Sequence, residues 1–92
     1  VTGEGIAVNH CTFQNNDSGR GSGIASFGSD LVAKNTRFDG NNNQRQGGGL
    51  WFWSETNDRT LVVDSCTFVN NSSSFGGGLY GYISTNSTIS II

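Results

Sequence analysis

The sequence contains no proline, no methionine, a single histidine and two cysteines, and only 13% of its 92 residues are charged. A lone histidine without a matching ligand pair gives no support to a transition-metal site. The net charge of −2 gives no reason to expect nucleic acid or an anionic membrane as a partner. No apolar run approaches the ~20 residues of a membrane-spanning helix, so we expect no membrane insertion.

The hydrophobic content is also low. Only 34% of the residues are hydrophobic, while glycine contributes 14 residues. A chain of this length forms one small domain at most, and this composition cannot build a compact core rich in leucine and isoleucine. The fold must therefore rely on something other than an ordinary globular core.

The sequence contains an internal repeat, which indicates a fold that does not need an ordinary globular core. Three segments align without gaps: CTFQNN (11–16), TRFDGN (36–41) and CTFVNN (66–71). A short β-branched or aliphatic run precedes each segment, at 6–8, 31–33 and 61–63. Glycines ending in an aliphatic residue follow each one, at 21–24, 47–50 and 76–79. The chain is about three copies of one unit.

Three strand-like runs per unit, with turn residues between them, predict a parallel β-solenoid of roughly three strands per coil. The coils cover approximately residues 6–30, 31–60 and 61–88, and a fourth begins at 89–92. Period-two alternation places corners at 9–10, 34–35 and 64–65. The link between Trp53 and Leu61 is the longest of its kind and is predicted to be the variable loop.

Two motifs in each unit also resemble a known family. F-x-x-N begins at Phe13, Phe38 and Phe68, and G-G-x-[IL] follows, with Ser22 replacing the second glycine in the first unit. These motifs resemble the repeats of polymorphic outer-membrane proteins and related adhesin-like, right-handed β-helices of the pectin-lyase-like superfamily. The resemblance implies an all-β, right-handed parallel β-helix. It says little about activity, because that superfamily includes adhesins, fibre proteins, lyases and hydrolases.

Stacking of the units at ~4.8 Å would align equivalent residues. Phe13, Phe38 and Phe68 are then expected to form an internal aromatic stack, and an amide ladder is expected from Asn16, Asn41 and Asn71. Cys11 and Cys66 occupy the same position two coils apart, ~9–10 Å, which is too far for a disulfide. We expect two buried, reduced thiols. Lys34 and Asp64 are expected to pair across coils.

The run after the glycines carries the most unusual residues. If Ile24, Leu50 and Leu79 face inward, alternation sends a set of aromatic side chains outward: Phe27, Trp51, Trp53, Tyr80 and Tyr82. An exposed aromatic strip of this size normally marks a contact surface, and tyrosine and tryptophan also stack on sugar rings. The alternative is that another chain segment, a neighbouring subunit or attached glycan covers the strip. Asn70 and Asn86 are the expected glycan acceptors among the sequons.

The sequence predicts no catalytic, cofactor or metal site. No two carboxylates fall in the same position of adjacent coils, so the repeat assembles neither an acid–base pair nor a calcium site. Asp30, Glu55 and Asp58 share the side of the variable loop and could approach one another there. We therefore do not expect an enzyme.

Neither end carries a recognisable cap, because the chain opens with VTGEG and stops at STISII. The expected partners are therefore flanking coils of a longer chain, or copies of the chain stacked end to end as a fibre. The expected role is that of a structural or adhesive β-helix outside the cell or on its surface, as part of a stalk or a fibre. The rival is a carbohydrate-binding or polysaccharide-degrading β-helix whose catalytic residues lie outside this segment.

Overall fold

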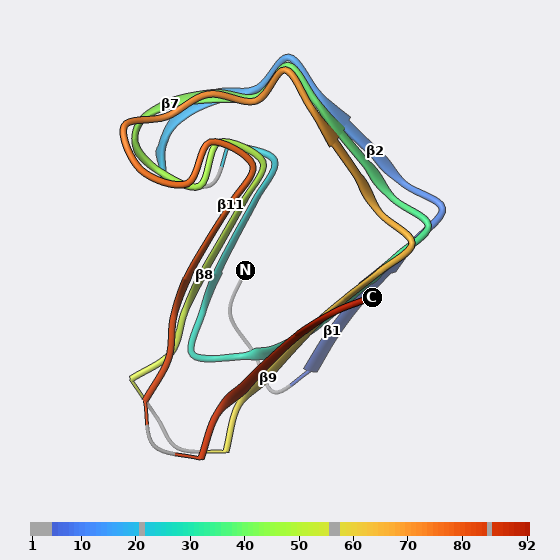
Figure 1. Cartoon of the computed structure of the whole chain (residues 1–92), viewed down its shortest axis with the longest axis vertical. Coiled ribbons are helices and arrows are strands. Elements are labelled where there is room, and N and C mark those ends of the chain that lie inside the picture. The colour runs from blue at the N-terminus through green and yellow to red at the C-terminus, as the bar shows by residue number, and fades with distance from the viewer. Residues whose placement is uncertain (1–4, 21, 56–57, 85) are drawn as a thin grey trace.

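The structure is a computed structural model that describes residues 5–20, 22–55, 58–84 and 86–92. These residues form a parallel β-solenoid, which confirms the all-β prediction. Its first sheet has the order β1-β5-β9-β12, with β1 at Gly5–Asn9, β5 at Asp30–Lys34, β9 at Thr60–Asp64 and β12 at Thr88–Ile91. In Figure 1 the chain runs counter-clockwise and later coils lie nearer the viewer, so the solenoid is right-handed.

Two further sheets complete the predicted strands. The second has the order β10-β6-β2, with β2 at Thr12–Gln14, β6 at Arg37–Asp39 and β10 at Thr67–Val69. The third has the order β11-β8-β4, with β4 at Ile24–Phe27, β8 at Leu50–Trp53 and β11 at Leu79–Tyr82. All pairs are parallel, and the register aligns Phe13, Phe38 and Phe68 across three coils.

A fourth sheet was not predicted. β3 at Asp17–Arg20 pairs with β7 at Asn42–Gln46, and single bridges from Ser72 and Phe75 extend this sheet to the next coil. This asparagine- and serine-rich part forms an arm that leaves the body of the coil and bends back towards the start of β8 (Figure 1). The expectation of three strands per coil was wrong here because backbone pairing between coils needs no apolar side chains.

The predicted corners depend on left-handed backbone conformations. His10, Asn35 and Ser65 have φ values of 56°, 50° and 56°, at the junction between the first and second sheets. One residue in this conformation shifts the side-chain alternation. Leu31 and Ala33 before the corner, and Phe38 after it, are therefore all fully buried.

The interior of the solenoid is narrow and layered. Phe38 lies between the rings of Phe13 and Phe68, with centroid distances of 5.3 and 4.6 Å and nearly parallel planes. A side chain on Gly49 would lie 2.6 Å from the Gly78 carbonyl oxygen and 2.9 Å from the Phe68 ring. Glycine at this position therefore lets the third sheet approach the phenylalanine stack. No helix long and apolar enough to cross a membrane occurs among the described residues.

Candidate contact surface

The outward side chains of the third sheet form a second aromatic stack on the outside of the solenoid. Its order is Phe27, Trp51, Trp53 and Tyr82, with successive centroid distances of 6.4, 5.6 and 4.0 Å. The interplanar angles of these three contacts are 21°, 22° and 12°. The four rings therefore form one continuous, nearly parallel stack that joins three coils.

The residues of this stack are not equally accessible. Phe27 and Tyr82 are 47% and 44% exposed, whereas Trp53 is half-buried. Tyr80 is half-buried as well. We define the aromatic face as the outward surface made by Phe27, Trp53 and Tyr82.

Trp51 corrects the prediction of a uniformly exposed strip, because only 7% of its surface is exposed. The Trp51 indole Nε1 donates a hydrogen bond to Gln46 Oε1 at 3.1 Å. Gln46 belongs to β7, so the arm that the sequence did not reveal contacts Trp51 from outside. The residue aligned with Trp51 in the first coil is Ala25, a small side chain, and the indole stacks on Phe27, two residues further along β4. The buried Trp51 ring thus packs against Phe27 and Trp53, two residues of the aromatic face.

A small hollow lies in this face. Phe27, Trp51, Trp53 and Glu55 line it, and its volume is about 180 Å³. The Trp53 indole Nε1 donates a hydrogen bond to Glu55 Oε1 at 3.2 Å, which holds the carboxylate beside the rings. Glu55 Oε2 accepts no hydrogen bond from the described residues. The hollow therefore combines aromatic walls with one available acceptor, and its lining residues in the described part of the chain include no basic side chain.

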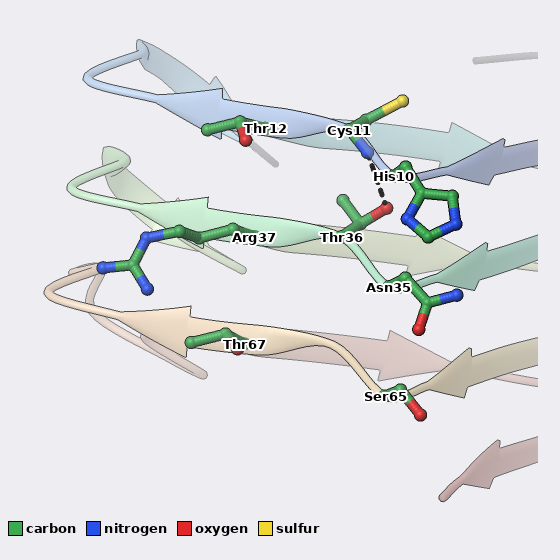
Figure 2. A pocket seen from close by; sticks show the side chains of 8 residues that line it. All are labelled: His10, Cys11, Thr12, Asn35, Thr36, Arg37, Ser65 and Thr67. Carbon is green, nitrogen blue, oxygen red and sulfur yellow. Dashed lines mark hydrogen bonds between the residues drawn. The ribbon is translucent and has the colours of Figure 1, made fainter.

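A larger and more polar hollow of about 390 Å³ lies at the corner between the first and second sheets. The corner residues His10, Asn35 and Ser65 follow one another down the stack, and Arg37 and two threonines extend the polar surface along the adjoining strands (Figure 2). The Arg37 guanidinium pairs with Asp39 at 3.1 Å. The sequence did not predict this hollow.

The two cysteines are free, but both are half-buried, whereas the sequence predicted buried thiols. Cys66 packs against the hydrophobic core and its thiol donates to the Ala33 carbonyl at 3.3 Å. Cys11 lines the polar hollow, and its thiol donates to the Asn9 carbonyl at 3.4 Å rather than to His10. The aligned residue between them, Thr36, is the one that is buried, at 2% exposure.

The other charged groups do not assemble into a site in the described part of the chain. No three His, Cys, Asp or Glu side chains converge there on a possible metal position. Lys34 and Asp64 are aligned in register, but they form no ion pair, and the Asp64 carboxylate accepts a hydrogen bond from Ser65 instead. Both residues end strands beside a corner, where solvent competes with a weak surface pair. Asp30 accepts a hydrogen bond from the backbone of Thr60.

The asparagines of the repeat have two different environments. Asn41 is fully buried, and the Asn16 and Asn71 side chains are hydrogen-bonded to it at 3.0 Å each. Asn70 and Asn86 are exposed and adopt φ values of 57° and 61°. The two candidate glycan acceptors therefore lie on accessible turns.

These features define a parallel β-helix with an aromatic outer face. Within it, residues 65–82 match the family model of the Chlamydia polymorphic membrane protein repeat. The matched segment contains the corner at Ser65, the third phenylalanine and asparagine of the repeat, and the third strand of the outer aromatic sheet. No curated protein and no solved structure matches the chain.

Proposed function

We propose that this chain is a structural or adhesive segment of an extracellular or cell-surface β-helix, with the aromatic face as its contact surface. The observation that carries the proposal is the four-ring stack on the outside of the third sheet, whose exposed members are Phe27 and Tyr82. Exposed apolar patches of this kind normally mark contact surfaces. The match to a membrane-protein repeat over residues 65–82 supports a position at the cell surface.

The contacts between coils support a structural role. Parallel backbone pairing in four sheets joins the first two coils, and the phenylalanine stack and the amide ladder continue into the third coil. Such contacts involve only neighbouring coils, so the same geometry can be extended without redesign. We propose that further coils pair with this segment, either from a longer chain or from stacked copies. Negative-stain electron microscopy of the native material tests this, since stacked copies would appear as filaments and globular single particles would contradict stacking.

Adhesion through the aromatic face is tested with the full-length protein that carries this segment, coupled to beads and offered to cells. The variant F27S/Y82S removes the two exposed rings without touching the core. The matched control is T12S/T67S, which changes two outward side chains of the second sheet. We expect F27S/Y82S to lower bead adhesion several-fold and the control to leave it unchanged. Equal adhesion of both variants and the parent protein would reject the aromatic face as the contact surface.

Glycan attached to the chain is a second way to occupy its surface. Asn70 and Asn86 remain the proposed acceptors because both are exposed and each begins a sequon. Peptide mass spectrometry of the native protein, before and after enzymatic removal of N-glycans, tests this. Unmodified peptides that cover both residues would refute the proposal.

A further inference from the structure

We infer that the hollow formed by Phe27, Trp51, Trp53 and Glu55 binds a neutral sugar ring of a partner glycan. The inference rests on the proposed function, because it specifies the chemistry that the aromatic contact surface recognises. The inferred site lies within the aromatic contact surface, takes a neutral sugar and holds its ring in one orientation.

The lining offers both kinds of contact that a pyranose ring uses. A sugar ring presents an apolar face of C–H groups and a rim of hydroxyl groups. Aromatic side chains provide a matching apolar surface. Glu55 Oε1 already accepts the Trp53 indole N–H at 3.2 Å, so its other oxygen is available to a sugar hydroxyl. A hydrogen bond to an ionised acceptor is stronger than one between neutral groups, so this contact would fix the ring in one orientation.

Size limits the ligand to one ring at a time. The volume of about 180 Å³ lies below the range of pockets that enclose whole drug-sized molecules. The aromatic face continues beyond the hollow, since Trp53 stacks on Tyr82 at a centroid distance of 4.0 Å. Successive rings of one glycan chain can therefore follow the stack from coil to coil. The hollow would bind one sugar residue, and that contact would determine the position of the glycan on the aromatic face.

The geometry of the rings argues against a cation. Recognition of quaternary ammonium groups uses the faces of several rings that enclose one point. Here the interplanar angles between contacting rings are 22° or less, so the rings form a nearly parallel stack and not a cage. A single carboxylate beside the rings does not change that arrangement.

Charge then separates neutral from acidic sugars. Among the described residues, Glu55 is the only charged one that lines the hollow, and the chain carries a net charge of −2. A uronic acid or another anionic sugar would bring its carboxylate close to Glu55 without a cation to balance it. The site therefore favours neutral hexoses and N-acetylhexosamines.

The floor of the hollow is fixed before any ligand arrives. Trp51 is 7% exposed and its indole N–H is bonded to Gln46 of β7, so the arm holds the ring in place. Trp53 is held by Tyr82 on one side and by Glu55 at its edge. A preorganised site loses little side-chain freedom on binding. The arm, which the sequence did not predict, therefore positions the Trp51 ring at the base of the hollow.

The test uses the full-length protein and tetrasaccharides as probes: maltotetraose, cellotetraose, mannotetraose and chitotetraose, with tetragalacturonate as the acidic probe and tetramethylammonium as the cation. Tryptophan fluorescence and proton NMR of the probe report binding. We expect at least one neutral probe to bind with a dissociation constant of about 1 mM or tighter. W53A should weaken that binding about 10-fold, as expected for the loss of one aromatic contact. The control T12A, on another face, should not change it.

E55Q provides a second readout that a general loss of folding cannot imitate. It removes the charge and keeps an oxygen acceptor, so neutral binding should persist while tetragalacturonate binding increases relative to the parent protein. Binding of tetramethylammonium in preference to every neutral probe would overturn the inference. So would neutral binding that W53A leaves intact.

The two proposals fail in different ways. If F27S/Y82S lowers bead adhesion but no neutral probe binds, the contact surface stands and the sugar site is rejected. If F27S/Y82S has no effect on adhesion while W53A abolishes binding of a neutral probe, the sugar site stands without the adhesive role.

Discussion

Asn41 and Asn71 belong to different coils, and one side-chain oxygen of Asn71 binds both the side chain and the backbone of Asn41. Asn71 Oδ1 accepts hydrogen bonds from Asn41 Nδ2 at 3.0 Å and from the Asn41 backbone N–H at 2.9 Å. Asn16 makes the same pair of contacts to Asn41 Oδ1 one coil earlier. The ladder therefore repeats the same bonds at each step, and Asn41 lies at its centre with no exposed surface.

Replacing Asn41 with alanine should strongly destabilise the fold. The substitution removes an acceptor for two donors of Asn16, and it also removes a donor to the Phe13 carbonyl. Because the groups left behind are partly buried, we expect a loss of about 3 kcal/mol in the free energy of unfolding. Urea denaturation followed by circular dichroism measures it. N42A, at the exposed neighbouring position, should cost far less, and equal losses would contradict the ladder as a stabilising element.

At Ser26 we expect a substitution to stabilise the fold. Its side chain is fully buried, and its hydroxyl has no hydrogen-bond partner in the structure. Because a buried hydroxyl without a partner destabilises the folded state, S26A is expected to raise the free energy of unfolding by about 1 kcal/mol. Ser29 is equally buried but donates to the Phe27 carbonyl, so S29A should not stabilise. A lower unfolding midpoint for S26A would show that its hydroxyl has a partner, such as a bound water.

Gly49 tests the close approach of the third sheet to the phenylalanine stack. An added methyl group would lie within 3 Å of both the Gly78 carbonyl and the Phe68 ring. We expect G49A to destabilise the chain by about 2 kcal/mol through overpacking. The control is G5A, because a methyl group there meets nothing within 4 Å. Thermal unfolding of the two variants compares them, and a neutral G49A would mean that the coils can move apart.

The two thiols should differ in their reactivity. Cys11 lines the open polar hollow, while Cys66 packs against the core. We expect a maleimide reagent to label Cys11 first under native conditions, and both thiols to react in denaturant. Timed labelling followed by peptide mass spectrometry measures the order. Preferential labelling of Cys66, or the finding of a disulfide between the two, would contradict the observed packing and register.

The coil-to-coil register was readable from the sequence, because the three copies align without gaps. Phe13, Phe38 and Phe68 pair in that register, and the corner residues adopt the left-handed conformation that the change of alternation required. Ile24 and Leu50, which we assumed from the sequence to face inward, are both buried. These features depend on local pattern and on backbone pairing, and both repeat with the sequence.

Other features were decided only by contacts between segments that the repeat does not connect. The arm around β7 has no apolar alternation, so nothing in its sequence revealed that it would bend back to Trp51. The alignment of Lys34 with Asp64 did not produce an ion pair, because position in register does not fix the direction of an exposed side chain.

The sequence by itself determined a stacked β-helix with an aromatic outer sheet, since period and alternation set which residues align and which face outward. Only the tertiary structure decided which aromatic rings remain exposed. Gln46 holds Trp51 beneath the surface, and Glu55 sits beside Trp53 at 3.2 Å. Those two contacts involve residues outside the repeated motifs, and together they turn a strip of rings into a hollow with a defined lining.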